Sequence, residues 1–198
     1  MRSIRKMAAA LVAAAAIPAT ALPLAAIPAT AHAAVLGGSF YAMQYDYREF
    51  YAVANGRPFR VELFGNPYPG LPMAEMARRL LPVLQANKPP PDLTFTYDAP
   101  AARPRPDYRL VLVFDAARNL DGGAICNGTT RFRPPTAGRV SVFAVYCRDE
   151  QALSQVGGWT TSAAPDDAGM SDLVKDLFNV VFERSTSGVL QHGHGFVR

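Results

Sequence analysis

Few residues in this 198-residue chain have side chains suited to acid–base or nucleophilic chemistry. Histidine is the usual acid–base group near neutral pH, because its ordinary pKa lies close to that range. The chain has three histidines: His32 in an N-terminal leader, and His192 and His194 in a C-terminal stretch without pattern. A Ser-His-Asp or Cys-His site needs a histidine on a rigid element. We therefore predict no catalytic site of either kind.

Carboxylates are the remaining acid–base groups. Asp107 and Asp115 bracket the apolar run DYRLVLVFD, and four more acidic residues lie in nearby loops: Asp98, Asp121, Asp149 and Glu150. A glycosidase-type hydrolase needs two carboxyl groups roughly 5 to 10 Å apart in a cleft. The spacing selects no pair, and aspartates at strand ends are common turn residues. A carboxylate-dependent hydrolase is therefore only the third of three functional hypotheses.

The two cysteines, Cys126 and Cys147, allow a single intramolecular pairing. They form no Cys-x-x-Cys motif and have no histidine nearby, which disfavours a redox or metal role. His192-Gly193-His194 supplies only two imidazoles, too few for a closed metal site. We predict a structural disulfide, with no metal and no cofactor.

Aromatic residues are the candidates for a contact surface, since exposed tyrosine and tryptophan supply large contact areas at modest entropic cost. The candidates are Tyr45, Tyr47, Tyr68 and Trp159. The alternative for each is a place in the core or over a sheet edge.

Residues 1–33 have the pattern of a secretory signal peptide. Three basic residues precede the apolar run MAAALVAAAAI, and Ala31-His32-Ala33 fits the small-x-small cleavage rule. We expect cleavage near Ala33, or earlier near Ala21, and a periplasmic or secreted protein. Prolines interrupt the leader, which disfavours a membrane anchor.

Charge argues against nucleic-acid binding. The whole chain has net charge +4, but three of its 20 basic residues lie in the leader, which leaves 17 against 16 acidic residues. The remaining arginines are scattered and form no basic stripe of the kind that neutralises phosphates. The length after the leader suits one domain.

Hydrophobic periodicity predicts the elements. Asn55-Gly56 is a hairpin signal between two predicted strands, 48–54 and 58–65. A helix is expected to start after Pro72 and to kink or end near Leu81, because Pro82 follows. The other predicted elements are strands over 93–97, 107–115 and 139–147, an edge strand over 157–161, and a helix over 170–182 capped by Ser171 or Asp172.

This order predicts an α+β fold: one mainly antiparallel sheet of about five or six strands, with two helices on one face. The domain is expected to span 48–183. A mobile aromatic-rich arm (34–47) would precede it, and a flexible tail (184–198) would follow.

Three segments, FYAVANGRPFRVELFGNPYPG, DYRLVLVFD and RVSVFAVYCRDEQALSQVGGW, resemble a family of uncharacterised exported proteins of alphaproteobacteria. The resemblance covers roughly residues 48–160 and implies neither an activity nor catalytic residues.

Our first functional hypothesis is a non-catalytic accessory or interaction protein of the bacterial envelope, with an envelope protein as its partner. The second is a protein that binds a small molecule or glycan in a pocket between sheet and helices.

Overall fold

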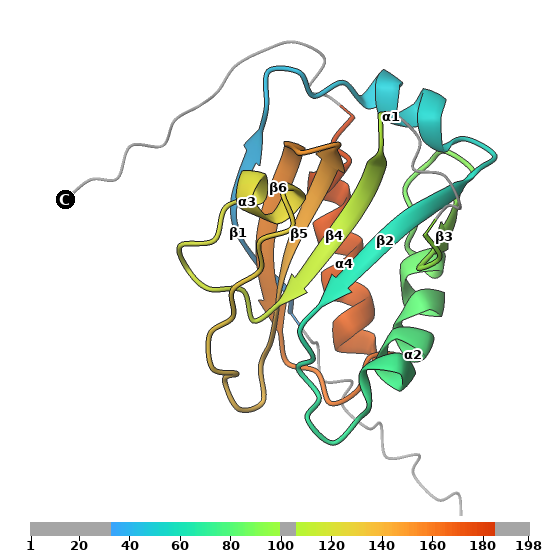
Figure 1. Ribbon diagram of the computed structural model, residues 1–198. Coiled ribbons are helices and arrows are strands. Elements are labelled where there is room, and N and C mark those ends of the chain that lie inside the picture. The colour runs from blue at the N-terminus through green and yellow to red at the C-terminus, as the bar shows by residue number, and fades with distance from the viewer. Residues whose placement is uncertain (1–32, 100–105, 185–198) are drawn as a thin grey trace, which may run out of the picture. The chain divides into compact units, whose positions relative to one another are not determined.

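The computed structural model describes residues 33–99 and 106–184 (Figure 1). The predicted leader and most of the predicted tail lie outside the described residues. The elements follow in this order: β1 (Val35–Tyr41), α1 (Tyr47–Ala54), β2 (Pro58–Phe64), α2 (Met73–Ala86), β3 (Thr94–Thr96), β4 (Tyr108–Phe114), α3 (Gly122–Cys126), β5 (Val140–Arg148), β6 (Gln151–Thr160) and α4 (Ala168–Val181).

The strands form one mixed sheet in the order β1-β6-β5-β4-β2-β3. The pairs β1–β6, β6–β5 and β5–β4 are antiparallel, whereas β4–β2 and β2–β3 are parallel. Helix α2 supplies the crossover that a parallel β2–β3 pair needs. The α+β class and the strand number are confirmed, and β4 and β5 lie at the centre of the sheet. The parallel pairs were not predicted.

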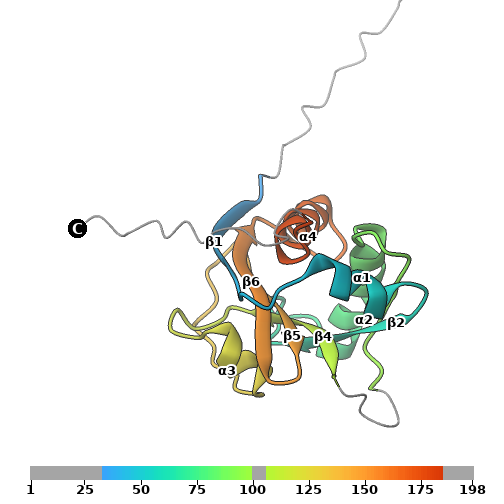
Figure 2. The same cartoon turned by 90° about the horizontal axis from the view of Figure 1, so that it is seen from above.

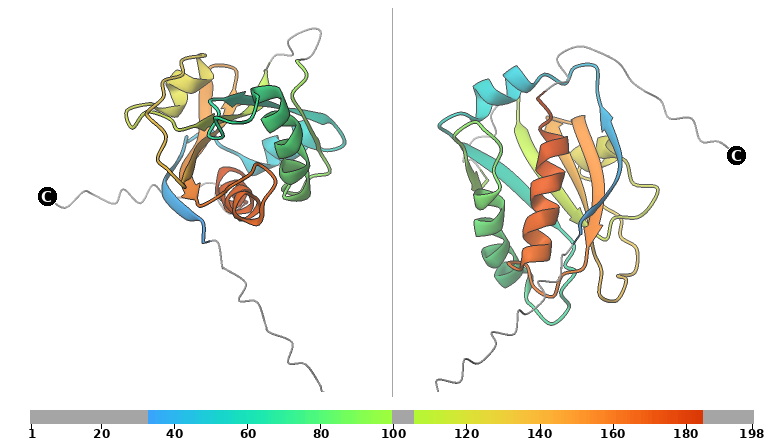
Figure 3. Two further views of the ribbon diagram at one scale, coloured as in Figure 1. Left: turned by 90° about the horizontal axis from the view of Figure 1, so that it is seen from below. Right: turned by 180° about the vertical axis from the view of Figure 1, so that it is seen from behind.

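Helices α2 and α4 lie on the same face of the sheet, as predicted (Figure 3). Because side chains alternate along a strand, Leu110 and Leu112 of β4 join the core beneath these helices. Val111 and Val113 point to the opposite face and join a second, smaller apolar cluster. Helix α3 lies on that opposite face, away from α4 (Figure 2).

The predicted disulfide, Cys126–Cys147, is confirmed and joins the end of α3 to β5, with 5.7 Å between the two Cα atoms. Both cysteines are buried. Arg109 of β4 reinforces this link, since its Nη2 donates a hydrogen bond to the Cys126 carbonyl at 2.7 Å. The disulfide and the arginine together attach α3 to the sheet.

The predicted hairpin at Asn55-Gly56 is wrong, because residues 47–54 form α1. Asp46 begins the helix: its carboxylate accepts a hydrogen bond from the Arg48 amide at 2.8 Å. Gly56 follows the helix with φ +70°, the left-handed conformation common just after a helix end. Phe50, which is fully buried, packs α1 against the end of the core.

The predicted mobile arm, 34–47, is likewise corrected, since it contains β1. This strand pairs with β6 from Val35↔Trp159 to Tyr41↔Ser154, with an irregularity between Leu36 and Ser39. Tyr41 adds a hydrogen bond from its hydroxyl to the Val180 carbonyl at 2.6 Å, at the end of α4.

Three boundaries also differ from prediction. Helix α2 continues through Pro82 to Ala86 without ending at Leu81. The strand expected at an edge over 157–161 begins at Gln151, and as β6 it lies inside the sheet between β1 and β5. Asp167, not Ser171 or Asp172, caps α4. No helix among the described residues is long and apolar enough to cross a membrane.

Candidate functional site

The long segment between β4 and β5 contains α3 and lies on the α3 side of the sheet. It begins at Asp115, whose φ of 48° turns the chain sharply. Its two halves are joined, because the Ala117 amide donates to the Arg131 carbonyl at 2.9 Å and the Arg133 amide donates to the Asp115 carbonyl at 2.8 Å. The segment therefore forms a folded flap over this face of the sheet.

A pocket of about 380 Å³ lies between this flap and strands β5, β6 and β1. We call it the arginine pocket. Its residues are Val35, Leu36, Gly37, Ala116, Ala117, Arg118, Leu120, Arg133, Arg139, Ser141, Val142, Phe143, Gly157, Gly158 and Trp159. The volume is within the range of pockets that hold small ligands, roughly 300 to 1,000 Å³.

Cross-strand pairing builds the floor of the pocket. Ser141 of β5 lies opposite Trp159 of β6, which in turn lies opposite Val35 of β1. Two residues further along β5, Phe143 lies opposite Gly157. Paired residues share one face of a sheet, so these side chains form two adjacent rows facing the flap.

Three arginines, Arg118, Arg133 and Arg139, supply the charge. The Arg139 guanidinium carbon lies 3.7 Å from the centre of the Trp159 ring, a cation–π contact that holds the guanidinium in place. The Nε atoms of Arg133 and Arg139 are buried without a hydrogen-bond partner. In the described part of the chain, no carboxylate lies within ion-pair distance of any of the three.

Ser141 contributes a buried hydroxyl to the same floor. The residue is 6% exposed, and its Oγ has no hydrogen-bond partner among the described residues. Buried hydroxyls are nearly always hydrogen-bonded, because leaving one unpaired costs about 1–3 kcal/mol. The pocket therefore holds a polar group that a bound molecule can satisfy.

Asp115 lies at the edge of this arrangement and is 7% exposed. Burial raises the pKa of its carboxyl group, and the positive charge of Arg133 opposes part of that rise. In its ionised form, Asp115 offsets some of the positive charge of the pocket.

A second, more open groove of about 1210 Å³ is lined by acidic residues, among them Asp121, Asp149 and Glu150. The hydrolase hypothesis needs carboxylates in one cleft, and this groove supplies them. Two of these carboxylates, however, already accept hydrogen bonds from backbone amides. Asp121 Oδ1 accepts a hydrogen bond from the Ala124 amide at 2.8 Å, and Asp149 Oδ1 accepts one from the Asp107 amide at 2.9 Å. Both carboxylates thus hold backbone in place.

The four predicted contact residues are not brought together. Tyr45 is only 5% exposed and belongs to the core, so it offers no contact surface. The Tyr47 hydroxyl donates a hydrogen bond to the Pro90 carbonyl. Tyr68 is half-buried beside Ser162. Trp159 alone lies in the arginine pocket.

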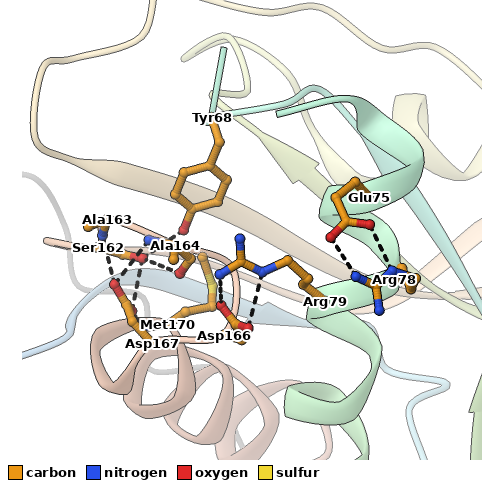
Figure 4. Close-up of polar contacts among 10 residues, drawn as sticks. All are labelled: Tyr68, Glu75, Arg78, Arg79, Ser162, Ala163, Ala164, Asp166, Asp167 and Met170. Carbon is orange, nitrogen blue, oxygen red and sulfur yellow. Dashed lines mark hydrogen bonds and ion pairs between the residues drawn. The ribbon is translucent and has the colours of Figure 1, made fainter. Parts of the chain in front are cut away.

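Tyr68 belongs to a polar junction at the start of α4 (Figure 4). Its hydroxyl lies 2.7 Å from Ser162 Oγ, which is also 3.0 Å from Asp167 Oδ1. Asp167 in turn accepts hydrogen bonds from the backbone amides of Ala163, Ala164 and Met170. Burial raises the pKa of Tyr68 to about 12, so it is no base at neutral pH. This cluster caps the helix and joins two loops.

Sequence reasoning missed the three arginines and Ser141. They are spread from 118 to 141, and no short motif connects them. The nearest sequence clue is the alternation Arg139, Ser141, Phe143, which assigns a cation, a hydroxyl and an aromatic ring to one face of a strand.

No family model, no curated protein and no solved structure matches this chain. Within residues 33–99 and 106–184, no group of three or more histidine, cysteine or acidic side chains is placed to hold a metal ion.

Proposed function

We propose that this protein is a non-catalytic binding protein of the bacterial envelope, and that it takes a small anionic molecule in the arginine pocket. One observation carries the proposal: three arginines that form no ion pair among the described residues line the same pocket as a buried hydroxyl with no hydrogen-bond partner among those residues. An anion supplies acceptors to both kinds of group.

The chemistry of the arginines supports an anion as ligand. A guanidinium presents its Nε and one Nη side by side, and this fork matches the two oxygens of a carboxylate or phosphate. The unpartnered Nε atoms of Arg133 and Arg139 leave that edge unused. Hydrogen bonds to charged groups contribute about 1.5–3 kcal/mol each, more than neutral ones.

A non-catalytic role is supported by the pocket lining, in which none of the described residues is a histidine or a carboxylate; Asp115 lies only at its edge. The described residues contain no histidine. The carboxylates of the acidic groove are mostly engaged with backbone amides.

Export is the second part of the proposal. Residues 1–33 have the features of a signal peptide, and the Cys126–Cys147 disulfide is typical of an oxidising compartment. We propose cleavage near Ala33, with Ala21 as the alternative, and a periplasmic or secreted location.

The binding test uses the full chain, expressed with its leader and purified from the envelope fraction. Its unfolding temperature is measured with acetate, benzoate or inorganic phosphate, with sodium chloride as reference at equal ionic strength. A ligand of the folded state raises this temperature with concentration. We expect at least one anion to do so, and Arg133→Gln to weaken its binding about tenfold or more.

Arg131→Gln is the matched control, because Arg131 is exposed on the same flap and does not line the pocket. Arg131→Gln should bind the anion with the same affinity as the unaltered protein. The proposal is overturned if no anion exceeds chloride, or if Arg131→Gln loses as much affinity as Arg133→Gln.

An envelope protein partner is the second candidate function. It is favoured by two apolar residues at the acidic groove, Met43 at 92% exposed and Phe40 at 47%. The test is in-cell crosslinking followed by purification and mass spectrometry. A stoichiometric partner that is retained by the unaltered protein and lost from a Phe40→Ser, Met43→Ser variant supports this candidate, and equal retention by both contradicts it.

A further inference from the structure

The arginine pocket is charged at one end and apolar at the other. Ser141 and Phe143 lie on one face of β5, and Arg139 immediately precedes the strand, so the pocket lining changes from cation to hydroxyl to aromatic ring along the chain. Each step advances about 6.6 Å along the strand. A ligand that matches this floor has a charged head and an apolar body.

The apolar end is flat on the strand side, because the glycines there bring no side chain. Gly157 lies opposite Phe143, and a Cβ atom at this position would stand 3.7 Å from Phe143 Cδ2, on the pocket side of the sheet. On the next strand, a Cβ at Gly37 would stand 3.4 Å from the Gly157 carbonyl oxygen. Two glycines on neighbouring strands thus bring no side chain to this part of the pocket, next to an aromatic ring.

We propose that the ligand is an organic anion with a flat apolar body, of the aryl carboxylate class. Its carboxylate pairs with Arg133 and Arg139 near the Ser141 hydroxyl. Its ring lies over Gly157 beside Phe143. This inference rests on the proposed function, since it names the ligand class of the same pocket.

Other anions fit less of the pocket. Inorganic phosphate or acetate satisfies the arginines but leaves the apolar end empty. The face of Trp159 that Arg139 covers is not available for stacking by a nucleic-acid base.

The experiment compares benzoate, which has both a ring and a carboxylate, with two compounds that each keep one of these groups. Benzyl alcohol keeps the ring without the charge, and acetate keeps the carboxylate without the ring. Affinity is measured on the full chain by calorimetry. Fluorescence localises binding, because Trp159 is the single tryptophan of the chain and lines the pocket. We expect benzoate to bind at least tenfold more tightly than either partial probe and to change Trp159 fluorescence.

Gly157→Val tests the flat strip by filling it with a β-branched side chain that suits a strand. It should weaken benzoate at least tenfold and leave the affinity for acetate unchanged. Gly157→Ala serves the same purpose, with a smaller loss, if the valine variant does not fold.

The outcomes separate this inference from the proposed function. If acetate binds as tightly as benzoate, the ligand class is wrong and an anion pocket stands. If benzyl alcohol equals benzoate, or if no probe alters Trp159 fluorescence, the anion pocket itself is wrong. Benzoate binding unchanged in the Gly157 variants also overturns the assignment of the ring to this strip.

Discussion

Ser141→Ala should make the protein more stable while weakening ligand binding, because the hydroxyl it removes has no hydrogen-bond partner among the described residues. The substitution removes one oxygen and leaves the packing nearly unchanged. An unpaired buried hydroxyl costs about 1–3 kcal/mol. We take the lower end of this range, about 1 kcal/mol. For a domain of this size, that corresponds to a rise of about 2–4 °C in the unfolding temperature.

Ser154→Ala is the matched control. Ser154 is a second buried serine of the same sheet, but its Oγ donates a hydrogen bond to the Val181 carbonyl at 2.6 Å. Removing a satisfied hydrogen bond should lower stability by about 0.5–1.5 kcal/mol. The two serine variants are therefore expected to change the free energy of unfolding in opposite directions.

The assay is denaturant unfolding of both variants and the unaltered protein with the disulfide intact, followed by Trp159 fluorescence. Calorimetry with benzoate gives the change in affinity. The reasoning is refuted if Ser141→Ala destabilises the protein as Ser154→Ala does, since the Ser141 hydroxyl would then be satisfied in the folded state. It is also refuted if Ser141→Ala binds benzoate with unchanged affinity.

The remaining predictions concern the frame around the pocket. Replacing both Cys126 and Cys147 with alanine should lower the free energy of unfolding by about 3 kcal/mol, because the disulfide no longer closes the loop between them. Denaturation of the oxidised protein and of the variant measures this difference. An unchanged denaturation midpoint would contradict the prediction. Asp167→Ala should cost about 1–2 kcal/mol through loss of the α4 cap. Burial pushes the pKa of Asp167 up, but hydrogen bonds led by the Met170 amide outweigh it and lower the pKa below its ordinary 3.8. Its stabilisation is therefore present above about pH 4 and lost as the pH falls below that value, so unfolding at pH 7 and pH 2 should differ more for the unaltered protein than for the variant. Asp115 is the reverse case, since burial raises its pKa and its charged form destabilises the fold. Asp115→Asn should stabilise the protein increasingly as the pH rises and have its smallest effect in acid; a loss of stability at pH 7 would show that the carboxylate is needed.

Several elements of the fold could be predicted from the sequence, since each depends on a pattern within one segment. The apolar residues of α4 recur at helical spacing from Met170 to Val181, and nearly all of them are buried. The runs that form β4 and β5 are apolar on both faces, as expected of central strands. The disulfide followed from the cysteine count alone, because two cysteines leave one pairing.

Other features depended on neighbours distant in the chain. Residues 47–54 have composition suited to a strand, yet the Asp46 cap and the burial of Phe50 against the core favour a helix. Residues 34–47 show no clear period, and only pairing with β6 makes part of them a strand.

The pocket depends most strongly on residues that are distant from one another in the chain. The flap contributes Arg118 and Arg133, β5 contributes Ser141, and β6 and β1 contribute Trp159 and Gly37. Each residue taken alone reads as an ordinary surface or turn residue. The sequence by itself determined the central strands, the last helix and the disulfide, because those depend on local periodicity and count. The tertiary structure decided the pocket, because strand pairing brings together side chains that are far apart along the chain, and burial then leaves their polar atoms without partners.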